Sequence, residues 1–380
     1  MDILPKNIYS SLKRFLPVSL KRKFKKQKPI FINPNFPAKP GCEKGRTLLI
    51  IVSDSFNQKI MRASTLLTLG YAHGWSEACG PVKLIWQKNI IKEISKHNNP
   101  IIFTNIYNYI NWGEKEIKFL KNYDSFSIVN VHPNKYEQFK KDNPLIGNGD
   151  PFFYGGHNEA CNKLIETKPK FVCSFAGNTA WDLFKDWQAD GLHFEFLKLA
   201  ADQNYYFPDP AIKKYGHIKM TYVGGYWPEK AQAFEMYLRP FEDILHTYGY
   251  GNWPYKHYGG ELDIAEERQL YSSAGLVPLV TSPAGWYMAE VTERYFKAPA
   301  CKAFCIADQN TGLKDVFTED EMLQAKNAEH FSELVNDYLK GKIDVNYWKN
   351  KAYEAVMNKH LYRHRALQIK NIFETKTELK

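Results

Sequence analysis

Short apolar runs alternate with amphipathic stretches along most of the first half of the chain. The runs with strand character are residues 47–52, 82–86, 100–106, 125–131, 170–176 and 193–200. Helical patterns lie between most of these runs, as at residues 62–72 and 178–188. Because strands that alternate with helices are typical of a parallel sheet covered on both faces, the pattern predicts an α/β domain.

The same rhythm restarts after a break at residues 205–216, YYFPDPAIKKYG. Strands are expected at 218–225, 274–282 and 303–308, and helices at 229–246, at 290–300 and in a final apolar stripe around 331–339. This predicts a second α/β domain that ends in helices. Ligands of open parallel sheets bind beyond the carboxyl ends of the strands, so two facing sheets would form a cleft.

The length agrees with this division, since 380 residues and 44.2 kDa suit two domains. A leader is expected at residues 1–30 and a linker rich in Pro and Gly at 31–46. The first domain then spans 47–212, the second 213–345, and helices at 346–380 are expected to cross back to the first domain.

The net charge of +10 is concentrated in the leader. Residues 1–30 hold nine Lys and Arg and a single acid, Asp2, whereas the other 350 residues hold 42 basic and 40 acidic side chains. Within the leader, Ile8, Leu12, Phe15 and Leu16 follow helical spacing. The leader is thus suited to an anionic membrane surface, and an inert leader and contact with nucleic acid are the alternatives.

The lack of a recognisable targeting signal and the pattern of the cysteines both favour a reduced compartment. No apolar segment is long enough to span a bilayer, and the start of the chain lacks the pattern of a signal peptide. None of the six cysteines forms a CxxC pair, so a zinc site is not expected. We therefore expect a cytoplasmic protein, peripheral at the inner membrane face if the leader binds lipid.

The first candidate site is the turn after the strand expected at 218–225. Gly224 and Gly225 would let the backbone approach a ligand, and Lys230 in the next helical turn could reach a phosphate. A plain strand-to-helix turn is the alternative.

Two further stretches carry candidate chemistry. In 247–260, TYGYGNWPYKHYGG, aromatic rings and amides suit a nucleoside or a sugar, or else pack a loop. In 288–309 the charged residues Glu290, Glu293, Arg294 and Lys297 could clamp a diphosphate and hold ribose hydroxyls, or form a solvated helix face.

In the first domain His73 and Asp54 are candidate general bases, although a lone histidine is more often structural. There is no GxSxG, GxxxxGK[ST] or HExxH motif, and no GxGxxG opens the first domain. These absences disfavour a nicotinamide enzyme and a P-loop phosphotransferase.

Four segments carry a family resemblance: VGGYWPEK, YGYGNWP, TERYFKAPACKAFCIAD and a distal HLYRHRALQI. In this order they resemble the "glycosyl transferases group 1" domain of GT-B glycosyltransferases, in the spore-maturation-type branch. The resemblance covers about residues 170–375 and implies two Rossmann-like domains facing across a cleft, with C-terminal helices.

The resemblance further implies a metal-independent, retaining transferase without a cofactor, which uses a UDP- or GDP-linked sugar as donor. The implied donor-binding residues are Gly224, Gly225, Tyr226, Trp227, Lys230, Tyr250, Gly251, Asn252, Trp253, Glu290, Glu293, Arg294 and Lys297. Lys297 departs from the family pattern, which often has an acid there, and Glu293 or Glu290 would then supply the carboxylate.

The acceptor is left open between a glycan, a lipid-linked molecule and a protein. Two other functions are kept as alternatives: a GT-B protein that binds nucleotide or sugar without turnover, and a transferase acting on nucleic acid. The nearly neutral body of the chain makes the nucleic-acid reading weaker.

Overall fold

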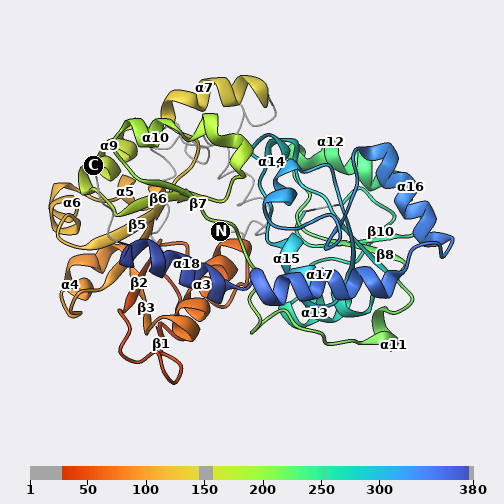
Figure 1. Cartoon of the computed structure of the whole chain (residues 1–380), viewed down its shortest axis with the longest axis horizontal. Coiled ribbons are helices and arrows are strands. Elements are labelled where there is room, and N and C mark those ends of the chain that lie inside the picture. The colour runs from red at the N-terminus through yellow and green to blue at the C-terminus, as the bar shows by residue number, and fades with distance from the viewer. Residues whose placement is uncertain (1–27, 145–156, 252, 376–380) are drawn as a thin grey trace, which may run out of the picture.

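The computed structural model describes residues 28–144, 157–251 and 253–375. The chain forms two lobes side by side, each with a twisted sheet between helices (Figure 1). The amino-terminal leader, on which the membrane prediction rests, lies outside the described residues except for 28–30, and so does Asn252.

The first lobe contains a seven-stranded sheet in the order β1-β3-β2-β4-β5-β6-β7. All neighbours are parallel except the short edge strand β1, which is antiparallel to β3. The strands are β1 (Asn35–Phe36), β2 (Leu48–Val52), β3 (Val82–Trp86), β4 (Ile101–Asn105), β5 (Asp124–Ile128), β6 (Phe171–Ser174) and β7 (Phe194–Phe196).

The helices of the first lobe connect these strands and cover both faces of the sheet (Figure 1). They are α3 (Ala63–Ala78), α4 (Ile90–Ile94), α5 (Ile106–Ile110), α6 (Glu114–Leu120), α7 (Pro133–Asp142), α9 (Asn158–Thr167) and α10 (Asp186–Ala189), with 3₁₀ turns η1 (Gln87–Asn89) and η2 (Asn178–Leu183). The helix predicted at 178–188 is therefore a 3₁₀ turn followed by a short helix.

The second lobe contains a six-stranded parallel sheet in the order β10-β9-β8-β11-β12-β13. The strands are β8 (Met220–Val223), β9 (Leu245–Tyr248), β10 (His257–Tyr258), β11 (Leu276–Leu279), β12 (Phe304–Ala307) and β13 (Leu323–Gln324). The central strands are buried along their whole length, as expected for a sheet covered on both faces.

The helices of the second lobe are α11 (Ile212–Tyr215), α12 (Pro228–Tyr237), α13 (Ile264–Ser273), α14 (Pro283–Tyr287), α15 (Arg294–Ala300), α16 (Ala328–Leu339) and α17 (Val345–Lys359), with η3 (Arg239–Phe241) and η4 (Thr311–Asp315). The last helix, α18 (Tyr362–Glu374), lies on the first lobe. The helix predicted at 229–246 was wrong in its second half. Pro240 cannot donate a backbone hydrogen bond and lies in η3, and Leu245–Tyr248 joins the sheet as β9.

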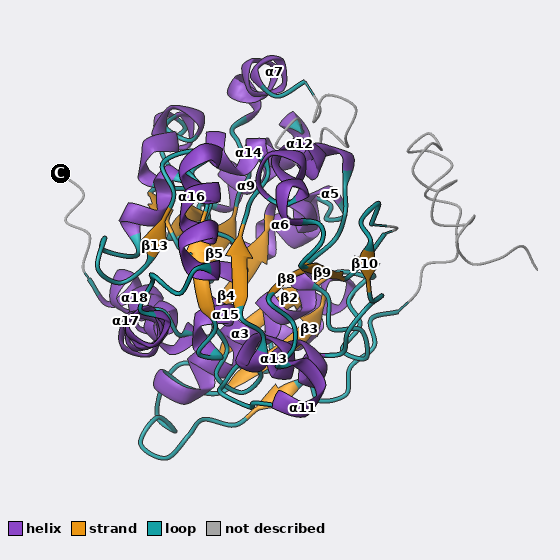
Figure 2. Cartoon of the chain, turned by 90° about the vertical axis from the view of Figure 1, so that its right-hand side faces the viewer, coloured by secondary structure: helices purple, strands orange, loops and turns teal. Residues whose placement is uncertain are grey.

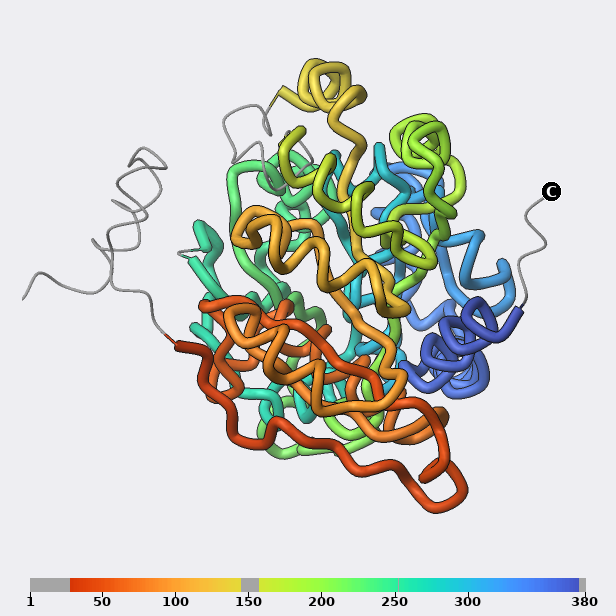
Figure 3. Tube along the Cα trace, turned by 90° about the vertical axis from the view of Figure 1, so that its left-hand side faces the viewer, coloured from red at the N-terminus to blue at the C-terminus, as the bar shows by residue number. Residues whose placement is uncertain are grey.

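The last two helices join the lobes. Helix α17 packs against α15 and β12 of the second lobe, whereas α18 packs along α3 of the first. The chain crosses between the lobes beside the residues just after β7: the amide of Ala201 donates to the carbonyl of His360, and Arg365 donates to the carbonyls of Lys198 and Leu199. Figure 3 shows α17 and α18 together at the edge of the molecule.

The predicted fold class is confirmed: two doubly wound α/β units with helices at the carboxyl end. In the described part of the chain, no helix has both the length and the apolar character that a bilayer-spanning helix needs.

Candidate functional site

The carboxyl edge of the second sheet begins with a glycine turn. Strand β8 ends at Val223, and Gly224 and Gly225 lead into helix α12. The amide of Gly224 donates to the carbonyl of Tyr248 at 2.8 Å, which holds the turn to β9. A Cβ atom on Gly224 would lie 2.5 Å from Nη2 of Arg294, so this close approach requires glycine.

The guanidinium group of Arg294 lies against this turn. Its Nε donates to the carbonyl of Val223 at 2.9 Å and its Nη1 to that of Val280 at 3.2 Å, and Cζ lies 4.1 Å from the ring centroid of Tyr222. The residue is only 9% exposed. Arg294 thus ties the ends of β8 and β11 together and places a positive charge at the carboxyl edge of the sheet.

Lys230 and Glu290 complete this charged group. Lys230 lies in the first turn of α12, and burial together with repulsion by Arg294 lowers its pKa to about 8. Burial raises the pKa of Glu290, and attraction to Lys230 opposes this change. Two cations and one carboxylate therefore interact at this edge of the sheet, with Arg294 against the glycine turn and Lys230 in the helix that follows it. This composition is suited to a diphosphate with hydroxyl groups beside it.

Comparison with known proteins identifies this lobe. Residues 209–371 match the family model described as "Glycosyl transferase-like". The chain has the GT-B fold, and over these residues its second lobe resembles glycosyltransferases. No curated protein sequence matches it significantly.

Solved structures that resemble the chain cover nearly its whole described length. Sucrose-phosphate synthase from Thermosynechococcus elongatus has 11% identity and a TM-score of 0.55, with coverage of 86% of this chain and 98% of that one. HepE from Anabaena in complex with UDP and glucose has 9% identity and a TM-score of 0.58, with coverage of 86% and 99%. A T4 phage BGT mutant in complex with UDP-glucose has 12% identity and a TM-score of 0.54, with coverage of 86% and 99%. At such identities these likenesses show the fold.

Glu293 and Lys297 face the junction between the lobes. Nζ of Lys297 lies 2.5 Å from Oε1 of Glu267, and the hydroxyl of Tyr362 donates to Oε1 of Glu293 at 3.1 Å. Burial raises the pKa of Glu293 to about 7. Both residues line a small cavity, which is completed by Leu66, Ala200, Asp202, Tyr206 and Tyr362.

The pair of Lys297 and Glu267 explains how the chain accommodates a lysine at this position. The carboxylate of Glu267 neutralises the ammonium group, and its second oxygen accepts from the hydroxyl of Tyr206 at 3.1 Å. The charge of Lys297 is therefore held inside the lobe by a partner from α13. Nothing near Lys297 in the sequence indicates this partner, which lies thirty residues earlier in the chain.

Trp253 of the predicted aromatic motif supports the glycine turn. Trp253 is 5% exposed, its Nε1 donates to the carbonyl of Gly224 at 3.1 Å, and its ring packs against Tyr222 and Tyr226. Tyr250 contacts the first lobe, because Cζ of Arg62 lies 5.3 Å from its ring centroid. Gly251 is exposed, with a positive φ of 83°.

Among the predicted donor-binding aromatic side chains, which the structure describes, Trp227 is the exposed one. It lies at the start of α12 with 38% of its surface exposed. A Cβ atom on Gly225 would lie 2.4 Å from its Nε1, so the indole covers the second glycine of the turn. Of the predicted aromatic contacts, Trp227 has the exposed ring that a nucleoside or sugar would need.

The two candidate bases lie in separate clusters of the first lobe. Burial would raise the pKa of Asp54, but hydrogen bonds from Lys88 at 2.6 Å, Trp86 at 2.8 Å and Gln87 at 3.1 Å lower it. Nδ1 of His73 lies 2.6 Å from Oδ2 of Asp202, which links α3 to the segment after β7. Their roles as general bases stay predictions.

Sequence reasoning missed Asp308, which organises the loops beneath the site. This fully buried carboxylate accepts from the amide of Thr281 at 2.8 Å, from Nε1 of Trp286 at 2.7 Å and from the hydroxyl of Tyr295 at 2.6 Å. It thereby fixes the loop between β11 and α15, on which Glu290 lies. The sequence feature that could have pointed to Asp308 is its position directly after the buried strand β12.

Within the described ranges, one group of side chains has the spacing of metal ligands: His132, Cys161 and Asp190 of the first lobe. Both imidazole nitrogens of His132 are already used. Nδ1 accepts from the amide of Asn134 at 3.2 Å, so Nε2 carries the proton that it shares with Asp190 at 2.9 Å. Without a free lone pair on His132, these residues do not fit a metal ion.

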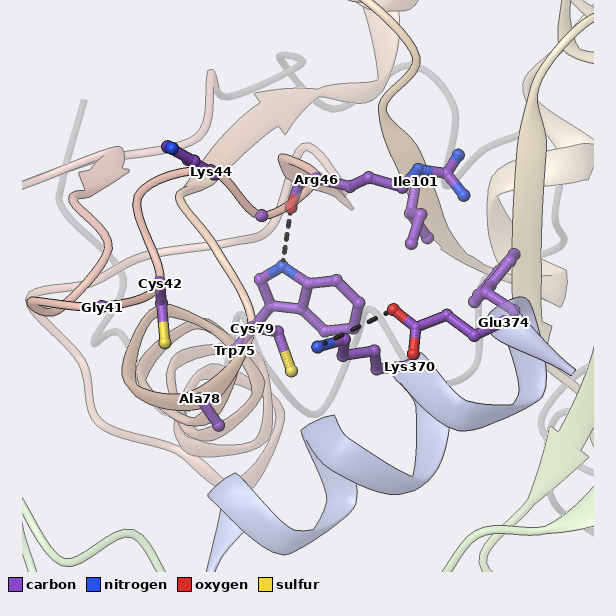
Figure 4. A pocket seen from close by; sticks show the side chains of 12 residues that line it. Gly41, Cys42, Lys44, Arg46, Trp75, Ala78, Cys79, Ile101, Lys370 and Glu374 are labelled. Atoms are coloured by element: carbon purple, nitrogen blue, oxygen red, sulfur yellow. Dashed lines mark hydrogen bonds and ion pairs between the residues drawn. The ribbon is translucent and has the colours of Figure 1, made fainter.

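A cavity of about 390 Å³ lies between the loop at residues 41–46, α3 and the end of α18 (Figure 4). Nε1 of Trp75 in its wall donates to the carbonyl of Arg46 at 3.0 Å. Arg46 precedes β2 and Ile101 begins β4, so the cavity lies at the amino edge of the first sheet. Because ligands of parallel sheets bind at the carboxyl edge, we do not place the transfer reaction in this cavity.

Proposed function

We propose that the protein is a glycosyltransferase, which transfers a sugar from a nucleotide-sugar donor, bound on the second lobe, to a hydroxyl group of an acceptor. The observation that carries this proposal is a group of charges at the carboxyl edge of the second sheet: Arg294 contacts Gly224, and Lys230, in the first turn of α12, interacts electrostatically with Arg294 and Glu290. The two cations match the charge of a diphosphate.

The reaction needs stabilisation of the diphosphate that leaves as the glycosidic bond breaks. Lys230 and Arg294 supply positive charge in a partly buried place, where it acts more strongly than in water. This is why we propose that transfer is independent of a metal ion. Glu290, beside Lys230, is the carboxylate that would hold hydroxyls of the ribose or the sugar, since Lys297 is paired with Glu267.

We propose retention of the anomeric configuration. Three donors occupy Asp54, so we propose that an oxygen of the departing diphosphate takes the proton of the acceptor hydroxyl. His73 is the rival base, because a carboxylate such as Asp202 at Nδ1 orients an imidazole for that role. Attack on the side from which the diphosphate leaves preserves the configuration. Determination of the product anomer by NMR tests this step, and an inverted product would contradict it.

Variants of the two candidate bases test the same step. We expect Asp54→Asn and His73→Asn to keep kcat within about tenfold of the wild-type value, whereas loss of a true general base costs about 10²–10⁴-fold. A loss of that size in either variant would assign the base to that residue.

The acceptor enters from the first lobe, and closure of the lobes excludes water. A glycan, a lipid-linked molecule or a protein fits the nearly neutral body of the chain. The basic residues 1–30 favour a molecule at an anionic membrane surface, at about 1 kcal/mol per basic residue near the lipid. UDP is the first nucleotide to test, because the HepE and BGT structures contain UDP or UDP-glucose.

The experiment is a thermal-shift screen against UDP, GDP, ADP, CMP and their sugar conjugates, with Mg²⁺ and with EDTA. A ligand at 100 times its dissociation constant adds about 2.7 kcal/mol to the free energy of unfolding. We expect one nucleotide to stabilise the wild type equally under both conditions and to have little effect on Lys230→Ala. Lys219→Ala is the matched control, because this exposed lysine precedes the amino end of β8 and should leave the shift unchanged.

The outcomes separate the candidate functions. No shift with any nucleotide would contradict the donor site, and a shift that requires Mg²⁺ would contradict metal independence. Binding without transfer or donor hydrolysis would instead favour a nucleotide-binding protein without turnover. Binding of nucleic acid that weakens steeply with salt would favour a nucleic-acid acceptor.

A further inference from the structure

Three exposed isoleucines form one surface at the start of the described chain. Ile30, Ile32 and Ile60 are 40%, 68% and 47% exposed, and together with Lys28 and Lys59 they are called the isoleucine patch. The residues come from two segments about thirty positions apart. Large apolar side chains gathered in this way on a surface are typical of a site of interaction.

Backbone pairing holds the two segments together. The amide of Ile30 donates to the carbonyl of Phe56 at 2.9 Å, and the amide of Gln58 donates to the carbonyl of Ile30 at 3.0 Å. Oε1 of Gln58, a buried side chain, accepts from the amide of Ile32 at 2.6 Å. The isoleucines are therefore presented by an ordered surface.

Side chains alternate between the core and the solvent along this segment, which explains why the isoleucines of the patch face the solvent. Phe31, between Ile30 and Ile32, turns inward and packs against Phe56, with 5.8 Å between the ring centroids. Gln58 is likewise directed inward, next to the exposed Lys59 and Ile60. The core needs Phe31 and Phe56, but neither the core nor the hydrogen bonds of this unit need isoleucine at positions 30, 32 and 60.

The charges around the patch are positive. Lys28, Lys59 and Arg62 are exposed beside it, and residues 1–27, which continue directly from it, hold eight Lys and Arg and one acid. Asp54, on the same loop as Lys59, is paired with Lys88 at 2.6 Å. Apolar side chains among lysines match the interface of an anionic bilayer, in which the apolar groups enter the headgroup region and the cations meet the phosphates.

We propose that the isoleucine patch inserts into the interface of an anionic membrane and docks the protein there. Arg62, at the edge of the patch, lies 5.3 Å from the ring centroid of Tyr250 in the second lobe, so the docked face includes the rim where the lobes meet. Figures 2 and 3 place the start of the described chain on the same side of the molecule as β10. The acceptor is then a molecule carried by the membrane. This statement about the acceptor rests on the proposed function, whereas docking to the membrane does not.

The test is co-sedimentation of the full chain with vesicles of phosphatidylcholine, with or without phosphatidylglycerol. We expect binding to the anionic vesicles, and a double variant Ile32→Ser with Ile60→Ser should bind about tenfold more weakly because apolar area is lost from the interface. Ile212→Ser is the matched control, since Ile212 is 62% exposed on the second lobe and should not affect binding. A triple variant of the leader, Lys23→Gln with Lys25→Gln and Lys26→Gln, should also bind more weakly.

Other occupants of the patch give different results. If the leader covers the patch within the chain, the double variant lowers the melting temperature and leaves vesicle binding unchanged. If a second copy covers it, the double variant abolishes self-association in analytical ultracentrifugation. Equal binding to neutral vesicles, or unchanged binding of the double variant, overturns the proposal. Nucleotide binding measured without vesicles shows independently whether the donor site is intact.

Discussion

Two cations in one helix have different surroundings and therefore different roles. Arg294 reaches the glycine turn, whereas Lys297, three residues later, points toward the lobe junction and pairs with Glu267. The structure shows that Arg294→Ala would affect the stability of the fold as well as donor binding. Because this guanidinium donates to two strand-end carbonyls, its removal would cost about 2–3 kcal/mol of folding free energy in addition to any lost donor affinity. Lys230 is the cleaner probe of the donor site.

The lowered pKa of Lys230 predicts a pH dependence of donor binding. Lys230 is charged below a pKa of about 8 and neutral above it. Since a diphosphate attracts the charged form, affinity should be highest below pH 8 and should fall above it, by at most about tenfold per pH unit. Calorimetric titration of the stabilising nucleotide between pH 7 and pH 10 measures this decline.

Lys230→Arg is the control for this titration, because arginine keeps its charge throughout that range. The variant should bind with little change between the two ends of the titration. If the wild type also shows no change, Lys230 does not contact the phosphates.

At the scale of elements, the close packing of α3 and α18 attaches the carboxyl end of the chain to the first lobe. Gly70 and Gly74 leave the space in which Tyr362 sits. A Cβ atom at position 74 would lie 2.4 Å from the carbonyl oxygen of Tyr362, and one at position 70 would lie 2.3 Å from its ring. The same tyrosine donates to Glu293, so this contact also fixes a group at the lobe junction.

We predict that Gly74→Ala destabilises the protein by about 1–3 kcal/mol, because α18 must move away from α3. The loss should exceed the gain of about 1 kcal/mol that alanine brings to a helix. Urea unfolding gives the difference, and Ser64→Ala, on the exposed face of the same helix, should change stability by less than about 0.5 kcal/mol. Equal stability of Gly74→Ala and the wild type would rule out such close packing.

At the scale of the whole molecule, polar contacts on several sides hold the lobes together. Oδ2 of Asp315 in η4 accepts from the amide of Asn178 at 2.9 Å and from Nζ of Lys198 at 3.0 Å, both in the first lobe. On another side the hydroxyl of Tyr287 in α14 donates to Asp142 in α7 at 2.9 Å. These contacts set the separation of the lobes and thereby the width of the space between donor and acceptor.

We predict that Asp315→Ala lowers the free energy of unfolding by about 3 kcal/mol, since it leaves Lys198 buried without its carboxylate. The lobes should also separate, which would increase the radius of gyration in small-angle X-ray scattering. The double variant Asp315→Leu with Lys198→Met removes both charges and should recover most of the stability. A single variant as stable and as compact as the wild type would show that this pair does not hold the lobes.

Features set by neighbouring residues were predictable from the sequence, whereas features set by contacts between distant residues were not. The strand at 303–308 was predictable because its apolar run is continuous, and the glycine turn at 224–225 because it follows such a run. Strand β9 was missed, because residues 229–246 read as one helix and only pairing with β8 makes Leu245–Tyr248 a strand. The partner of Lys297 and the role of Asp308 were equally hidden, since each depends on residues distant in the sequence.

The sequence by itself determined the two α/β units, the position of the glycine turn and the concentration of positive charge in the leader. These properties follow from the local order of apolar, small and charged residues. Only the tertiary structure decided which charges face the turn, because burial and a partner from another element set the direction and the pKa of each side chain. It also joined Ile32 and Ile60 into one surface through the hydrogen bonds of Gln58, which no local pattern specifies.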